Sequence, residues 1–130
     1  MSLRVVIIED EAPAFRRLQK ILEEVEPDVE LLEVLDSVEE AVKWIRENEL
    51  PDLIFMDIQL SDGISFEIFD EVTISCPVIF TTAFDEYMLK AFKVNSIDYL
   101  LKPIKVEDLR ASLSKLKSLK NHFSESGFSI

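Results

Sequence analysis

The chain has 130 residues, 48% of them hydrophobic, which is enough to form one domain around a single core. Its 26 acidic and 14 basic side chains give a net charge of −12, the wrong sign for neutralising a nucleic-acid backbone, so this segment alone is not expected to bind DNA. No apolar run approaches the roughly 18 residues that a membrane helix needs, and no signal-peptide pattern opens the chain. The single cysteine, Cys76, cannot form an internal disulfide. These features favour a cytoplasmic protein that does not contact a membrane.

Apolar runs and helical periodicity alternate along the chain. Short apolar runs without polar alternation are typical of strands buried on both faces. The predicted strands are Val5–Ile8, Leu31–Leu35, Leu53–Met56, Val78–Phe80 and Tyr99–Leu101. The predicted helices carry Phe15, Leu18, Leu22 and Val25; Val38, Ala41, Val42 and Ile45; and Leu109, Leu113 and Leu116, with shorter helices over Ser65–Val72 and Glu86–Val94. Ser37 and Glu40 form a capping-box pattern at the start of the second helix.

Five alternations of strand and helix predict an α/β fold. In such a fold parallel strands are joined by right-handed crossovers, and helices cover both faces of the sheet. No internal repeat or interdomain linker is visible. We therefore expect one domain over residues 1–123, with residues 124–130 as a flexible tail or the start of a linker, because this stretch contains several serines and a glycine.

Acidic residues follow two of the predicted strands: Glu9 and Asp10 after the first, and Asp57 after the third. In an open parallel sheet, ligands bind beyond the carboxyl ends of the strands, where the strand order reverses. If that point falls between these two strands, the carboxylates meet and repel one another unless a cation lies among them. Mg²⁺ is such a cation, since it prefers oxygen ligands. Taken alone, each acid is better explained as a solvated loop residue or a helix N-cap, and only their combination favours a functional site.

Two more polar residues end predicted strands at the same edge. Thr82 follows the fourth strand, and Lys102, before Pro103, follows the fifth. Taken singly, Thr82 is better explained as a capping hydroxyl and Lys102 as a surface lysine with a solvated ammonium. Their convergence with the carboxylates is what indicates a functional site.

This combination resembles the signature of response-regulator receiver domains over nearly the whole chain. The residues that carry the resemblance are Glu9-Asp10, Asp57, Thr82-Ala83 and Lys102-Pro103. The segments that begin at Met56, Phe80 and Asn95 further resemble the LytTR type. The resemblance implies a flavodoxin-like three-layer fold with five helices and a five-stranded parallel sheet in the order 2-1-3-4-5.

The resemblance also implies roles for the acidic residues. Asp57 is expected to be the phosphoacceptor, receiving a phosphoryl group from a sensor histidine kinase. Asp10 and Asp57 would bind Mg²⁺ directly, Glu9 would bind it through water, and the main-chain carbonyl of Gln59 would complete the protein ligands. Glu9 departs from the pattern, since many receivers have aspartate there, and its extra methylene is expected to retune the affinity for the ion rather than abolish it.

The remaining implied roles concern switching. Lys102 would neutralise charge on the phosphoryl group, and Thr82 would bond its oxygen while Tyr99 turns inward; ordinary core packing explains Tyr99 equally well. A cis bond before Pro103 is also implied. Phosphorylation is expected to strengthen a homodimer, and DNA binding is expected only through a C-terminal effector domain missing from this sequence. The predicted dimer face consists of Glu86–Val94, Ile97–Leu101 and Val106–Leu119.

Other classes of protein fit less well. A flavodoxin-like electron carrier would need a hydroxyl- and glycine-rich loop after the first strand, where this chain has Glu9, Asp10 and Glu11. A haloacid-dehalogenase-type phosphatase would need an aspartate two residues after Asp10, where Ala12 stands. With two glycines the chain cannot build a P-loop or a dinucleotide fingerprint. A pseudo-receiver that acts only as an interaction module stays open, although the full set of acid, hydroxyl and lysine argues against it.

Overall fold

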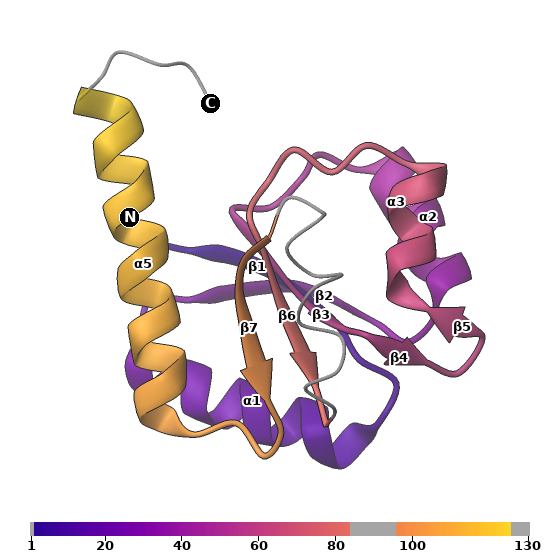
Figure 1. Ribbon diagram of the computed structural model, residues 1–130, viewed down its shortest axis with the longest axis horizontal. Helices are drawn as coiled ribbons and strands as arrows, with labels where there is room; N and C mark the ends of the chain where they lie inside the picture. The colour runs from indigo at the N-terminus through magenta and orange to yellow at the C-terminus, as the bar shows by residue number, and fades with distance from the viewer. Residues whose placement is uncertain (1, 84–95, 126–130) are drawn as a thin grey trace.

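The computed structural model describes residues 2–83 and 96–125, and it contains a five-stranded parallel sheet at its centre (Figure 1). The strands are β1 (Arg4–Ile8), β2 (Glu30–Leu35), β3 (Leu53–Asp57), β6 (Val78–Thr82) and β7 (Ser96–Leu101). Their order is β2-β1-β3-β6-β7, so the predicted order 2-1-3-4-5 is confirmed, with β6 and β7 as the predicted fourth and fifth strands. The strand order reverses between β1 and β3, so the expected ligand-binding position lies beyond the carboxyl ends of these two strands.

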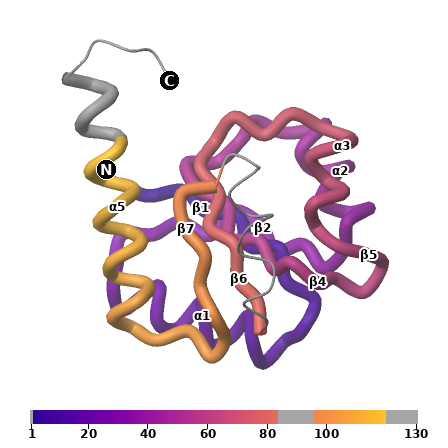
Figure 2. The backbone as a smooth tube through the Cα atoms, in the orientation of Figure 1, coloured from indigo at the N-terminus to yellow at the C-terminus, as the bar shows by residue number. Residues whose placement is uncertain are grey.

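Helices cover both faces of the sheet. They are α1 (Ala12–Val25), α2 (Val38–Glu47), α3 (Ile68–Glu71), which follows a 3₁₀ turn at Ser65–Glu67, and α5 (Val106–Glu125). In the backbone trace α1 and α5 lie on one face, and α2 and α3 lie on the other (Figure 2). The α/β flavodoxin-like fold is therefore confirmed. The fifth predicted helix, Glu86–Val94, lies outside the described residues, while α5 continues through Ser124 and Glu125.

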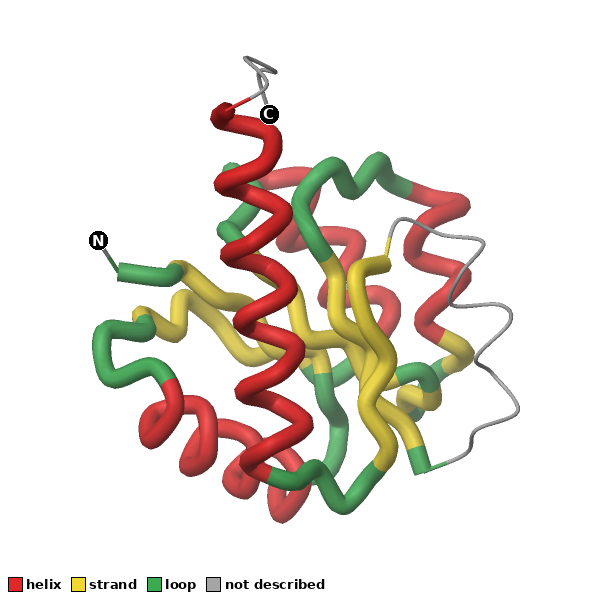
Figure 3. Tube along the Cα trace, turned by 60° about the vertical axis from the view of Figure 1, so that its left-hand side comes forward, coloured by secondary structure: helices red, strands yellow, loops and turns green. Residues whose placement is uncertain are grey.

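Successive residues of each central strand pack against opposite helix layers. Val5 and Ile7 of β1 pack in the core between the sheet and the layer formed by α1 and α5, where α5 runs across the sheet (Figure 3). Val6 and Ile8 pack on the opposite face, against the layer formed by α2 and α3. All five residues of β3 are buried. A strand that is covered on both faces needs apolar side chains in both directions, which explains why the sequence shows runs rather than alternation.

Helix α2 begins with an N-cap at Ser37, whose hydroxyl accepts a hydrogen bond of 3.0 Å from the Glu40 amide. This half of the predicted capping box is confirmed. The reciprocal contact differs: the Glu40 carboxylate accepts from the Asp36 amide, one residue before the cap. Like-charged Asp36 and Glu40 are thereby held together, and the side-chain hydrogen bond between them raises the pKa of Glu40.

A small antiparallel hairpin, made of β4 (Gln59–Leu60) and β5 (Gly63–Ile64), follows β3 directly and was not predicted. Gly63 has φ 154°, a backbone conformation that residues with a Cβ atom rarely adopt, so this position favours glycine. The peptide bond between Lys102 and Pro103 is cis, as expected. Within the described residues no helix is both long and apolar enough to cross a membrane.

Candidate functional site

The polar residues singled out in the sequence lie at one edge of the sheet. Glu9 comes directly after β1, Asp57 and Thr82 are the last residues of β3 and β6, and Lys102 comes directly after β7. The parallel register places Ile8 beside Met56 and Thr82 beside Leu101, so the four strands end at nearly the same level. Carboxyl ends of parallel strands meet at such an edge, which explains how residues from distant parts of the chain come together.

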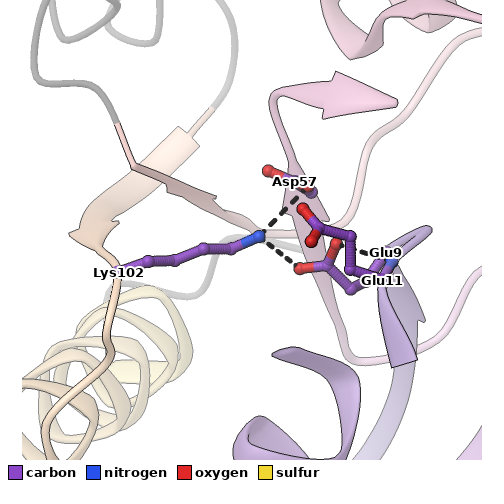
Figure 4. A network of polar contacts seen from close by, with 4 residues as sticks. All are labelled: Glu9, Glu11, Asp57 and Lys102. Atoms are coloured by element: carbon purple, nitrogen blue, oxygen red, sulfur yellow. Dashed lines mark hydrogen bonds and ion pairs between the residues drawn. The ribbon is translucent and has the colours of Figure 1, made fainter. Parts of the chain in front are cut away.

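An ion-pair network joins three of these side chains (Figure 4). The Lys102 ammonium nitrogen lies 2.6 Å from Glu9 Oε1 and 3.2 Å from Asp57 Oδ2. The other oxygen of Glu9 accepts a hydrogen bond of 3.2 Å from the Glu11 amide. The Glu9 and Asp57 side chains are each 5% exposed and that of Lys102 is 19% exposed, so these charges interact largely shielded from water.

Three carboxylates converge beside this lysine. Glu9, Asp10 and Asp57 each offer an oxygen atom within 4.8 Å of the other two. Asp10 Oδ1 is buried and has no hydrogen-bond partner among the described residues. One ammonium group cannot balance three carboxylates, and a buried carboxylate oxygen without a partner is costly. Oxygen ligands, excess negative charge and an unsatisfied oxygen fit a hard divalent cation such as Mg²⁺.

Burial and repulsion from Glu9 raise the pKa values of two of these acids, Asp10 and Asp57. Burial, with added repulsion from Glu9, raises the pKa of Asp57 to about 7, although Lys102 opposes the change. Burial also raises the pKa of Asp10. For Lys102, burial acts to lower the pKa, but the hydrogen bond to Glu9 and the charges of both carboxylates outweigh it and raise the pKa above its ordinary value. A cation that entered this site would therefore displace protons from the acids.

Residues 5–114 match the response regulator receiver domain family. The chain belongs to this family. It is 38% identical over 121 residues to the sensory transduction protein LytT of Bacillus anthracis, covering 91% of this chain and 48% of that protein. It is 35% identical over 120 residues to the transcriptional regulatory protein BtsR of Salmonella typhi, covering 88% and 48%. The chain thus spans about half the length of the curated relatives it matches.

Solved structures agree with this assignment. The response regulatory domain of protein mrkE from Klebsiella pneumoniae superposes with a TM-score of 0.78 at 27% identity, over 92% of this chain and 99% of that one. The anti-anti-sigma factor PhyR from Bartonella quintana has a TM-score of 0.79 at 24% identity, over 98% and 52%, which supports the fold alone. The predicted receiver family is confirmed, and the LytT relatives support the LytTR type.

The receiver domain brings together Glu9, Asp10, Asp57 and Lys102. Thr82 is buried, and its carbonyl accepts a 2.7 Å hydrogen bond from the Lys102 amide. Tyr99 is half-buried against the core on the α2 and α3 side.

Two further side chains hold the loops around the site and were not predicted. The Arg17 guanidinium bonds the carbonyl of Ile104, in the loop after β7, and the Asp62 carboxylate bonds the start of α2. The Asp62-Gly63 pair is a turn signal that could have indicated the hairpin. No local pattern could have indicated that Arg17 reaches a residue 87 positions away.

Proposed function

We propose that this receiver domain accepts a phosphoryl group on Asp57 from the phosphohistidine of a sensor histidine kinase, with the help of Mg²⁺. The observation that carries the proposal is the convergence of Glu9, Asp10 and Asp57 within 4.8 Å, with Lys102 bonded to two of them. Core packing does not account for three clustered acids in a position so largely shielded from water. The site's location at the switch point of the sheet supports the same conclusion.

Asp57 would act as the nucleophile. One of its carboxylate oxygens attacks the phosphorus atom, the bond between phosphorus and the histidine nitrogen breaks, and the electron pair of that bond returns to the imidazole ring. The product is an acyl phosphate on Asp57. No general base is required, because the carboxylate attacks in its ionised form, but the raised pKa means that Asp57 must first lose any bound proton.

The other acids would hold the cation. We propose Asp10 and Asp57 as direct ligands, Glu9 as a ligand through water, and the main-chain carbonyl of Gln59 as the remaining protein ligand. When bound, Mg²⁺ supplies positive charge that stabilises the transferring phosphoryl oxygens. Lys102 adds an ammonium that already lies 3.2 Å from Asp57, so its charge is in place before the reaction begins.

The switching steps would follow from the new charge on Asp57. We propose that the Thr82 hydroxyl then bonds a phosphoryl oxygen and that Tyr99 turns into the space released. Because Thr82 and Tyr99 lie on the neighbouring strands β6 and β7, this change would reach the surface formed by β7 and α5. We propose that this surface, together with Glu86–Val94, forms the homodimer face, and that an effector domain beyond this segment binds DNA. The kinase draws its phosphoryl group from ATP, so we propose that this exchange occurs in the cytoplasm.

The test is an intact-mass measurement after exposure to acetyl phosphate, with and without Mg²⁺. We expect one added phosphoryl group in the parent that depends on both reagents, and none in Asp57→Asn. Asp70→Asn, which makes the same change at an exposed position on α3, serves as the control and should label like the parent. Labelling of Asp57→Asn at the parent rate would refute the assignment of Asp57. A parent that never labels would favour the pseudo-receiver.

A further inference from the structure

The tip of the β4–β5 hairpin is bonded to the beginning of helix α2. Asp62 Oδ1 accepts a hydrogen bond of 2.7 Å from the Val38 amide, and Asp62 Oδ2 accepts one of 3.1 Å from the Glu39 amide. These are the first two N–H groups of α2, which have no partner within the helix itself. The bond from Val38 lowers the pKa of Asp62, as expected for a carboxylate at a helix N-terminus.

The same short segment is bonded to the acidic end of β1. The Glu9 amide donates a 2.8 Å hydrogen bond to the carbonyl of Leu35, which is three residues before Val38. The Ser61 hydroxyl adds a longer contact of 3.5 Å to the Asp36 carbonyl. Residues 35–39 therefore contact the segment that carries Glu9 on one side and the hairpin on the other.

The hairpin begins at Gln59, two residues after Asp57. Its base is fixed to the sheet by the Ile58 amide, which donates to the Thr81 carbonyl of β6, and it is closed by the Ser65 amide, which donates to the Ile58 carbonyl. Two paired residues on each strand make a hairpin that is marginal by itself. The contacts at its tip must therefore contribute to its position, and both bonds of Asp62 are shorter than the contact of Ser61.

We propose that Asp62 is a positioning residue for the cation site. By bonding the start of α2, which follows the segment bonded to Glu9, it fixes the hairpin that begins at Gln59 relative to Glu9 and Asp10. Gln59 offers the proposed carbonyl ligand and Asp10 a carboxylate ligand, and the distance between them decides whether one ion can reach both. Asp62 does not bind the ion, because its carboxylate is occupied by the α2 amides. This inference rests on the proposed function for the cation site and adds the residue that holds the Gln59 carbonyl in position relative to the acids.

The experiment compares Asp62→Ala with Ser37→Ala. Both changes remove a side-chain cap from the same helix, but only the first releases the hairpin. Isothermal titration with Mg²⁺ should give a dissociation constant about tenfold weaker for Asp62→Ala, the lower end of the loss seen when groups that orient metal ligands are removed. Ser37→Ala should bind Mg²⁺ like the parent. Asp62→Asn keeps one carbonyl acceptor, so its dissociation constant for Mg²⁺ should lie between those of the parent and Asp62→Ala. It replaces Asp62→Ala in the comparison if that variant does not fold.

Hydrogen exchange in metal-free protein provides the second measurement. Amides of residues 59–64 should lose protection in Asp62→Ala and keep it in Ser37→Ala. The inference is overturned if the Asp62 variants bind Mg²⁺ as tightly as the parent, or if Asp62→Ala and Ser37→Ala weaken binding equally, because helix stability would then be the cause. A parent that binds Mg²⁺ but accepts no phosphoryl group would refute the proposed function alone. A parent that does not bind Mg²⁺ would refute both.

Discussion

The guanidinium of Arg17 donates two hydrogen bonds to the main-chain carbonyl of Ile104, at 3.0 Å from Nε and 2.7 Å from a terminal nitrogen. Arg17 lies on α1, and Ile104 lies two residues after Lys102, so this contact joins a helix on one face of the sheet to the loop that carries the ammonium of the site. The planar guanidinium can present two donors to one oxygen, which a lysine cannot do in the same geometry.

Replacing Arg17 with alanine should therefore destabilise the domain. We expect the free energy of unfolding to fall by about 1.5 kcal/mol, the lower end for bonds from a charged donor, because water can partly replace the exposed side chain. Urea denaturation measures this change. Arg16→Ala removes the neighbouring exposed arginine and should change the free energy by no more than about 0.5 kcal/mol. Equal effects of the two substitutions would show that the bonds to Ile104 contribute nothing.

The raised pKa of Asp57 predicts a pH-dependent cost of keeping its carboxylate ionised. Between its ordinary pKa of 3.8 and about 7, the folded state binds a proton that the unfolded state does not, so this group's contribution to stability falls as pH rises. Asp57→Asn should therefore be more stable than the parent at about pH 8 in the presence of a chelator, and the difference should shrink toward about pH 5. The full shift corresponds to about 4 kcal/mol, and the pKa of about 7 already includes the opposing attraction of Lys102. Denaturation at both pH values measures the difference, and a constant difference would contradict the shift.

Mg²⁺ should stabilise the parent and not Asp10→Ala. An ion that binds only the folded state at about 100 times its dissociation constant adds about 2.7 kcal/mol to the free energy of unfolding. Asp10 carries the unpartnered buried oxygen of the cluster, so its removal should weaken binding most directly. Thermal denaturation with and without Mg²⁺ measures this stabilisation in the parent and in Asp10→Ala. Asp70→Asn should keep the Mg²⁺ response, and a full response in Asp10→Ala would exclude Asp10 as a ligand.

Cys76 should resist thiol reagents while the domain is folded. Burial raises the pKa of its thiol to about 11, and the residue is only 8% exposed, so little reactive thiolate forms at neutral pH. Reaction with a chromogenic disulfide should be slow in buffer and fast in urea. Because Cys76 is the only cysteine in the chain, the signal comes from one site. Equal rates in both conditions would mean that the pocket around Cys76 opens readily.

The sequence predicted the sheet well because burial on both faces leaves a simple pattern. Val5–Ile8 and Leu53–Met56 were located to within one residue, and the structure extends them to Arg4 and Asp57. The convergence of Glu9, Asp10 and Asp57 followed from strand ends alone. The bond from Lys102 to Glu9, shorter than that to Asp57, was not predicted, because it depends on side-chain reach across three strands.

The contacts that hold the site's loops were beyond local patterns. Asp62 and Val38 lie 24 residues apart, and their bond exists only after the hairpin and α2 have docked on the sheet. The hairpin was missed because two-residue strands carry no periodicity. Long-range polar contacts of this kind depend on tertiary structure, which a propensity-based interpretation of one sequence does not contain.

Exposed leucines on the two edge strands allow a direct test of the proposed dimer face. Leu101 on β7 is 46% exposed and Leu32 on β2 is 36% exposed, and these strands form opposite edges of the sheet. In a two-fold dimer the same patch occurs on both partners, so one substitution alters the interface at two symmetric positions. If the β7 and α5 surface forms the dimer, Leu101→Lys should weaken association and Leu32→Lys should not.

The measurement is sedimentation equilibrium at several concentrations, with and without beryllofluoride as a stable phosphoryl mimic. We expect the mimic to tighten the parent dimer by at least about tenfold, which requires only about 1.4 kcal/mol. Leu32→Lys should keep this response, because the edge that it alters lies three strands away from β6, where Thr82 would bond the phosphoryl group. Leu101→Lys should remain monomeric in both states while still accepting a phosphoryl group from acetyl phosphate, since its side chain contributes nothing to the acidic cluster. Identical dissociation constants for the parent with and without beryllofluoride would refute dimerisation as the output, and equal defects in Leu32→Lys and Leu101→Lys would refute the assignment of the interface to the β7 and α5 surface.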